Sequence, residues 1–62
     1  MSIHFRVCRE GPLAKWAVLL EGQPYGEYLD KDAALNDATD AAREAREGGH
    51  AAEVWEGAVR IY

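Results

Sequence analysis

The stretch that most constrains the fold of this chain is residues 30–49, which have the pattern of one alanine-rich amphipathic helix. Apolar residues recur there at three- and four-residue steps, so they share one stripe of a helix. The stripe consists of Ala34, Leu35, Ala38, Ala41, Ala42 and Ala45. Asp30 is expected to cap the first turn, and Gly48 with Gly49 offers the left-handed residue that ends many helices. Because alanines let a helix lie close to its partner, the rest of the chain must supply the bulk of the core.

The remaining residues alternate in the manner of short strands separated by turns. Strands are expected at residues 2–9, 15–21, 25–29, 52–56 and 58–62, with turns at the Gly and Pro residues between them. Residues 16–20 are apolar on both faces, which is typical of a central strand rather than an edge strand. The order along the chain is therefore β-β-β-α-β-β.

The connections between these elements predict how the strands lie in the sheet. Three strands joined by tight turns form an antiparallel meander. The helix must then cross one face of the sheet, and a right-handed crossover places the fourth strand beside the first. The predicted spatial order is third, second, first, fourth, fifth. We therefore expect residues 1–62 to form a single small α+β domain of two layers, with one helix on one face of a mostly antiparallel sheet.

The length and the cysteine content limit how such a domain is stabilised. A chain of 62 residues buries only about 60% of the surface of its unfolded form, so additional stabilisation is usual. Cys8 is the single cysteine, which excludes an internal disulfide, and the residues that commonly bind metals lack paired zinc-site spacing. Self-association remains as the stabilising device. The cysteine usage and the absence of a long apolar run predict a cytoplasmic protein with no membrane segment.

The charge is concentrated on the predicted helix. The chain has a formal net charge of −4, and residues 30–47 carry six acidic and three basic residues. The helix is thus expected to present a solvated acidic surface. An acidic surface repels phosphates, so a nucleic-acid site would have to use the other side of the molecule.

Candidate catalytic pairs are weak in this sequence. His4 and Cys8 could suggest a thiol–imidazole pair, but four residues along one strand separate them by roughly 13 Å. Asp40 and Glu44 are one helical turn apart, and on an exposed helix surface beside Arg43 they are expected to form a solvated network rather than an acid–base pair. The glycines match no phosphate-binding loop. We expect no catalytic residue, no cofactor and no metal, and hence no enzyme.

The sheet face that the helix leaves uncovered is the candidate interaction face. Strand alternation assigns to it His4, Arg6, Leu19, Trp55, Arg60 and Tyr62, with Cys8 and Ala17 between them and Tyr28 as a further candidate. Trp, Tyr and Arg are enriched at protein interfaces, which favours a homodimer or another protein partner. Aromatic residues interleaved with arginines also resemble surfaces that stack single-stranded nucleic acid. In a third interpretation, Trp55 folds over an edge of the sheet and completes the core.

Several short motifs resemble a family of short prokaryotic domains of unknown function. The resemblance rests on residues 5–7, 16–18 and 21–22, on the Ala- and Arg-rich helix at residues 31–46, and on the hairpin at residues 54–61. It implies the fold and no activity. The β-β-β-α-β order is also similar to antitoxin-like domains with a partial ribonuclease-H-type fold, which implies neutralisation of a partner by the acidic helix and a sheet edge. The expected function is a non-enzymatic self-associating or protein-interaction module; the alternatives are single-stranded nucleic-acid binding and antitoxin-like neutralisation.

Overall fold

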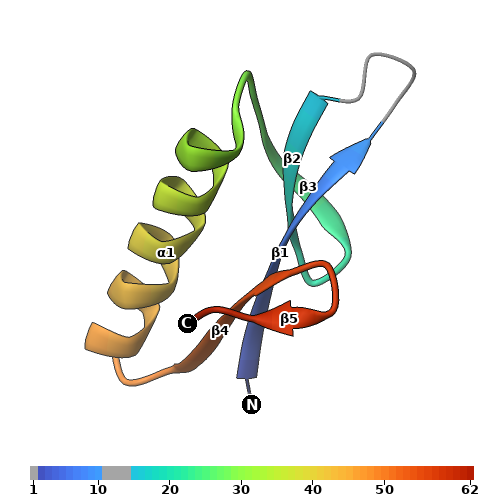
Figure 1. Cartoon of the computed structure of the whole chain (residues 1–62). Helices are drawn as coiled ribbons and strands as arrows, with labels where there is room; N and C mark the ends of the chain where they lie inside the picture. Colours follow the sequence, from blue (N-terminus) through green and yellow to red (C-terminus); the bar gives the residue numbers. More distant parts are fainter. Residues whose placement is uncertain (1, 11–14) are drawn as a thin grey trace.

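In the computed structural model, which describes residues 2–10 and 15–62, one helix packs against one face of a five-stranded sheet (Figure 1). The elements are β1 (Ser2–Glu10), β2 (Lys15–Leu20), β3 (Gln23–Tyr28), α1 (Lys31–Glu47), β4 (Ala51–Glu56) and β5 (Val59–Arg60). The predicted two-layer α+β fold with the order β-β-β-α-β-β is confirmed. The turn expected at Gly11 and Pro12 lies outside the described residues.

The strand order is β3-β2-β1-β4-β5, as the right-handed crossover predicts. The pair β1–β4 is parallel, and the other three pairs are antiparallel. The register sets Arg6 opposite both Leu19 on β2 and Trp55 on β4. Trp55 is in turn opposite Arg60 on β5. These four side chains therefore form one row across the sheet face that α1 does not cover.

The helix begins and ends at the residues that its sequence predicts. Asp30 has an extended backbone, and its Oδ1 accepts a hydrogen bond of 2.8 Å from the N–H of Ala33. At the other end the N–H of Gly48 donates to the carbonyl of Glu44 at 3.0 Å. Gly49 follows with a φ of 91°, a conformation that glycine adopts without steric cost.

The core lies between the alanine stripe of α1 and the valines of the sheet. Ala34, Ala38 and Ala42 are fully buried, and Leu35, Ala41 and Ala45 pack at the margin of the same cluster. The sheet contributes Val7, Val18 and Val54, whose exposed fractions are 1%, 0% and 0%. Burying each valine stabilises the fold by roughly 1.5–3 kcal/mol. Small side chains on the helix thus meet larger ones on the central strands.

The β2–β3 connection is tighter than the sequence suggested. Glu21 and Gly22 have φ values of 52° and 82°, as in a type I′ turn of two residues. The expected turn at residues 22–24 is therefore wrong, because Gln23 and Pro24 already belong to β3. Pro24 is tolerated there since β3 is an edge strand.

The end of the chain departs from strict alternation, and Tyr62 is not on the uncovered face. The N–H groups of Ile61 and Tyr62 both donate to the carbonyl of Val54, at 2.9 and 3.3 Å. Two residues opposite one partner shift the side-chain parity, as in a β-bulge. The Tyr62 ring consequently packs beside the core, with the guanidinium of Arg46 over it. The prediction that Tyr62 shares a face with Arg60 is wrong.

Tyr28 likewise lies on the helix side, where it packs against the core. It is opposite Trp16 in the β2–β3 register, and Trp16 also packs on that side. A register shift between Val18 and Leu19 sets the parity of β3. Tyr28 therefore does not extend the candidate interaction face.

Candidate functional site

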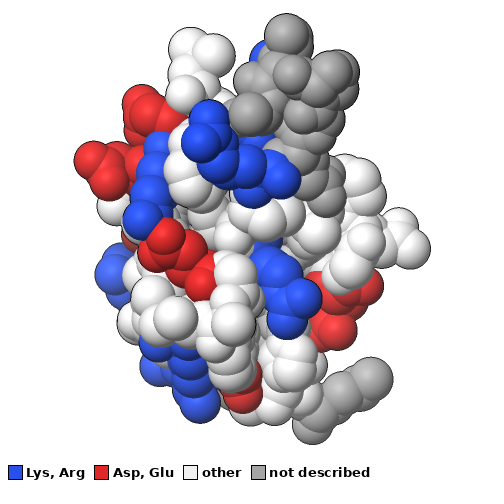
Figure 2. Space-filling model, turned by 45° about the vertical axis from the view of Figure 1, so that its right-hand side comes forward, with Lys and Arg blue, Asp and Glu red and all other residues white. Residues whose placement is uncertain are grey.

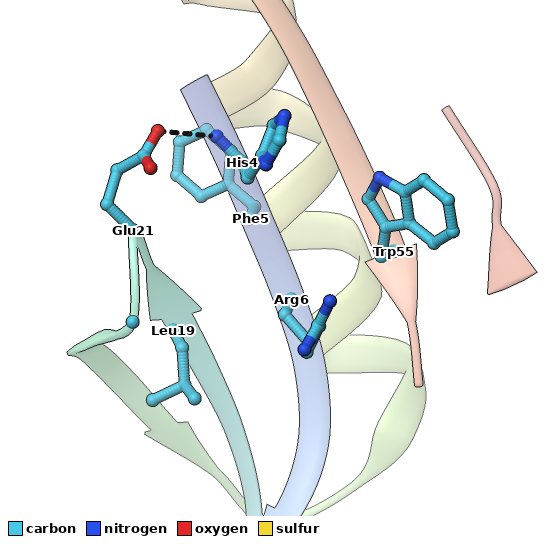
Figure 3. Close-up of a pocket in the computed structure, with 7 residues that line it drawn as sticks. His4, Phe5, Arg6, Leu19, Glu21 and Trp55 are labelled. Carbon is cyan, nitrogen blue, oxygen red and sulfur yellow. Dashed lines mark hydrogen bonds between the residues drawn. The ribbon is translucent and has the colours of Figure 1, made fainter. Parts of the chain in front are cut away.

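The sheet face opposite α1 contains a hollow of about 290 Å³ (Figure 3). It is lined by His4, Phe5, Arg6, Leu19, Glu21, Gly22 and Trp55. Four of the six predicted face residues are thus brought together around one depression, namely His4, Arg6, Leu19 and Trp55. Arg60 lies beside Trp55 on β5, and Tyr62 lies on the other side of the sheet.

Strand geometry explains why these side chains converge. His4 and Arg6 are two residues apart on β1, so they project to the same face. Leu19 and Trp55 flank Arg6 from the neighbouring strands. The hollow therefore has an aliphatic wall on β2, an aromatic wall on β4 and two basic side chains on the strand between them.

Glu53 holds the aromatic wall in place. The indole Nε1 of Trp55 donates a hydrogen bond of 2.8 Å to Glu53 Oε1. His4 Nε2 lies 3.7 Å from the same oxygen, and Arg60 Nη1 lies 3.8 Å from Oε2. The Trp55 hydrogen bond, helped by the charges of Arg60, His4 and Arg46, lowers the pKa of the Glu53 carboxyl against a smaller opposing effect of desolvation. Glu53 therefore remains a carboxylate that orients Trp55.

Arg6 differs from the other four arginines, all of which lie in the described part of the chain. Arg43 pairs with Asp40, Arg46 with the Ala52 carbonyl, and Arg60 with the Tyr62 carbonyl. Arg9 lies over the Trp16 ring at 5.4 Å and makes further interactions. The Arg6 guanidinium is exposed and has no hydrogen bond or ion pair among the described residues. An arginine side chain thus reaches the hollow with its donors uncommitted.

Glu21 supplies a negative charge to the hollow from the β2–β3 turn (Figure 3). Its Oε1 accepts a hydrogen bond of 2.9 Å from the backbone N–H of His4, which directs the carboxylate toward the β1 side of the turn. This bond uses one of about four acceptor positions of a carboxylate. The backbone of Glu21 has a φ of 52°, a conformation that glycine or asparagine adopts more readily.

The sequence-based choice of site residues omits both Glu21 and Glu53. Alternation placed Glu53 on the same face as Trp55, and that signal could have included it. Glu21 ends the expected strand at residues 15–21 with the parity of Leu19, so the same signal could have included it, although its left-handed backbone could not be foreseen. Glu53 lies within 4 Å of the His4 and Arg60 side chains, and Glu21 accepts from the backbone N–H of His4.

Charges of both signs are mixed over this part of the surface. The view in Figure 2, turned toward the uncovered face, shows Lys and Arg in separate patches beside acidic and uncharged surface. Strand parity assigns Arg6, Lys15, Arg60, Glu27 and Glu53 to this face, and Glu21 lines its hollow from the β2–β3 turn. Cations and carboxylates are thus mixed on this face, and the side chains between them are apolar. Ala17 is only 5% exposed there, and Leu19 is half-buried.

Other chemical groups lie apart from the hollow. Residues 2–10 and 15–62 contain no group of three or more His, Cys, Asp and Glu side chains that could hold a metal ion. Cys8 is half-buried on β1. On the helix side, burial of the hydroxyl and the neighbouring Asp37 carboxylate raise the pKa of Tyr28 to about 12.

Comparison of the chain with protein-family models, curated proteins and solved structures gives no match. The resemblance to the short prokaryotic family therefore stays a prediction. Among the described residues, α1 is neither long nor apolar enough to cross a membrane.

Proposed function

We propose that this chain is a non-enzymatic, cytoplasmic self-association module, and that a second copy of the chain covers the sheet face opposite α1. We infer that the partner is a second copy from the charges and the apolar side chains of the face, and not from its exposure alone. A two-fold symmetric dimer brings the same patch of both subunits together, so the patch must be complementary to itself.

The mixture of positive and negative side chains on the uncovered face carries this proposal. A face of one sign would repel its own copy, whereas cations mixed with carboxylates can pair with the same set after rotation. The outer surface of α1 lacks this property, since residues 30–47 carry twice as many acidic as basic residues. The uncovered sheet face is therefore the self-complementary one.

The apolar centre of the face and the small core support the same proposal. Trp55 and Leu19 flank Arg6, and interface centres are enriched in aromatic residues and arginine. A standard interface buries about 800 Å² on each partner, which is about a fifth of the 4191 Å² exposed by this chain. Association would give a second layer to a sheet that has a helix on one side only.

Binding of single-stranded nucleic acid is the second candidate, because Trp55 beside Arg6 could stack a base and contact a phosphate. The carboxylates of Glu53 and Glu21 border those two side chains and would repel the phosphates. Antitoxin-like neutralisation of another protein would use the acidic surface of α1 and a sheet edge. We treat both as outcomes that the following experiment separates from self-association.

Sedimentation equilibrium over a roughly hundredfold concentration range tests the proposal at concentrations around typical dimer affinities. The expected result is a dimer that Trp55→Ala dissociates, with the fold retained by circular dichroism. Asp40→Ala, on the exposed surface of α1, serves as the control and should leave the mass unchanged. A monomeric wild-type chain would overturn the proposal. Quenching of Trp fluorescence by short oligonucleotides, reversed by salt, would then favour the nucleic-acid function.

A further inference from the structure

We propose that the two-fold axis of this dimer passes through the hollow, so that Arg6 of each copy binds the partner's Glu21. The inference rests on the proposed function and adds to it the pair of side chains that fixes how the two copies are oriented.

Arg6 needs an acceptor from the second copy once that copy covers the hollow and removes water from the guanidinium. A guanidinium keeps its charge at any physiological pH and offers five N–H donors. Arg6 has no acceptor among the described residues, and it lies between the apolar side chains that an interface would bury. Covering such a charge without pairing it is strongly unfavourable. A copy that covers Leu19 and Trp55 must therefore bring a carboxylate or carbonyl oxygen to Arg6.

Among the carboxylates of this face, Glu21 is the one suited to that role. Glu53 is committed to Trp55 Nε1 and lies within 4 Å of His4 and Arg60. Glu27 is on the edge strand β3 and does not line the hollow. Glu21 lines the hollow, is exposed, and has a carboxylate already directed by the His4 N–H.

The backbone at Glu21 adds an independent observation. A non-glycine residue with a φ of 52° is uncommon, and asparagine or glycine would suit this turn better. Residues kept in unfavourable backbone conformations cluster at functional sites. The cost of a glutamate at this position is offset if its carboxylate binds the partner's guanidinium.

Two-fold symmetry then doubles the contact. Arg6 lies between the two walls of the hollow, Glu21 lies at the β2–β3 turn, and the two side chains are not paired with each other (Figure 3). A two-fold axis that lies in the plane of the interface, passes midway between them and is perpendicular to the line joining them exchanges the two positions. Each dimer would therefore contain two equivalent Arg6–Glu21 pairs, and these pairs would select one orientation from those that apolar contact alone allows.

Charge-reversal variants test the pairing. Arg6→Glu sets two carboxylates against each other at both contacts, and Glu21→Arg sets two guanidinium groups against each other. Each variant alone should raise the dimer dissociation constant at least about tenfold. An equimolar mixture of the two should recover a one-to-one heterodimer, because both contacts are then of opposite charge. Lys15→Glu and Glu27→Arg are controls on the same face and should change the constant by less than about threefold.

The outcomes separate this inference from the proposed function. A wild-type monomer would overturn both. A wild-type dimer whose affinity survives Arg6→Glu, or variants that fail to recover a heterodimer when mixed, would overturn the pairing and leave self-association standing. Circular dichroism of each variant shows whether Glu21→Arg folds after losing its hydrogen bond with His4. Recovery in the mixture would itself demonstrate that both variants fold.

Discussion

The guanidinium carbon of Arg46 lies 4.0 Å from the centre of the Tyr62 ring. The same guanidinium donates from Nε and Nη2 to the carbonyl of Ala52, at 3.0 and 2.8 Å. One side chain in the last turn of α1 thus joins the helix to β4 and to the residue two positions beyond β5. A planar fork with several donors can make these contacts together, and an ammonium cannot.

Arg46→Lys should accordingly lower the free energy of unfolding by about 1–2 kcal/mol, through loss of the stacked ring and of one hydrogen bond. The positive charge near the helix end is retained, so the change isolates the geometry of the guanidinium. Urea denaturation measures the effect. Arg43→Lys is the matched control, since Arg43 makes only an exposed pair with Asp40, and it should change stability by less than about 0.5 kcal/mol.

The closeness of helix and sheet makes a second prediction. Ala38 is fully buried in the middle of α1, and its methyl group packs in the core cluster between the helix and the sheet. Ala38→Leu should destabilise the fold by about 1–3 kcal/mol, because the extra carbons force the layers apart. Asn36→Leu adds an apolar side chain to the exposed surface of the same helix. If thermal unfolding showed equal effects for the two, the close packing would not be the cause.

Trp55→Phe should raise the pKa of the Glu53 carboxyl toward its ordinary value of 4.5. The indole N–H is the largest of the effects that lower this pKa, and phenylalanine has no donor. The pKa is below its ordinary value in the folded chain, so the associated stability is present above pH 4.5 and is lost as the pH falls through the lowered pKa. Carboxyl chemical shifts of Glu53 followed by NMR titration measure the change. Trp16→Phe, on the helix side, should leave that titration unaltered.

The raised pKa of the Tyr28 hydroxyl predicts a loss of stability at alkaline pH. Its hydroxyl keeps its proton to a pKa of about 12 in the folded chain, against 10.0 ordinarily, mainly through burial and then through Asp37. The associated stability is full below pH 10.0 and falls as the pH rises toward 12. Asp37→Asn should lower the Tyr28 pKa, measured by ultraviolet absorbance with Tyr28→Phe for assignment. Asp40→Asn is the control, and an equal shift in that variant would contradict the role of Asp37.

Periodicity and connection rules were sufficient for the framework of the fold. The spacing of Ala34, Ala38 and Ala42 predicted the buried stripe of α1, and all three are fully buried. The handedness of the crossover predicted that β4 joins β1, because few topologies satisfy that rule with one helix. These features depend on regular elements, whose side-chain direction follows from residue number alone.

The errors arose where the backbone leaves regular geometry. Ile61 and Tyr62 share Val54 as a partner, and this irregularity turned Tyr62 to the helix side. A left-handed turn set Glu21 at the hollow, although its side chain gives no sign of such a conformation. The sequence also could not predict that Arg6 has no hydrogen bond or ion pair among the described residues, since this depends on which carboxylates the other strands bring near. Four of the six predicted face residues nevertheless line the hollow.

The parallel pairing of β1 with β4 also bears on how the chain folds during synthesis. β1 emerges from the ribosome before the helix, but one of its edges has no partner until residues 51–56 have been made. Until then, the backbone groups along that edge of β1 have no strand partner. The loop closure that brings β4 beside β1 therefore comes late. The final topology therefore cannot form before residues 51–56 have been made, because they are the parallel partner of β1.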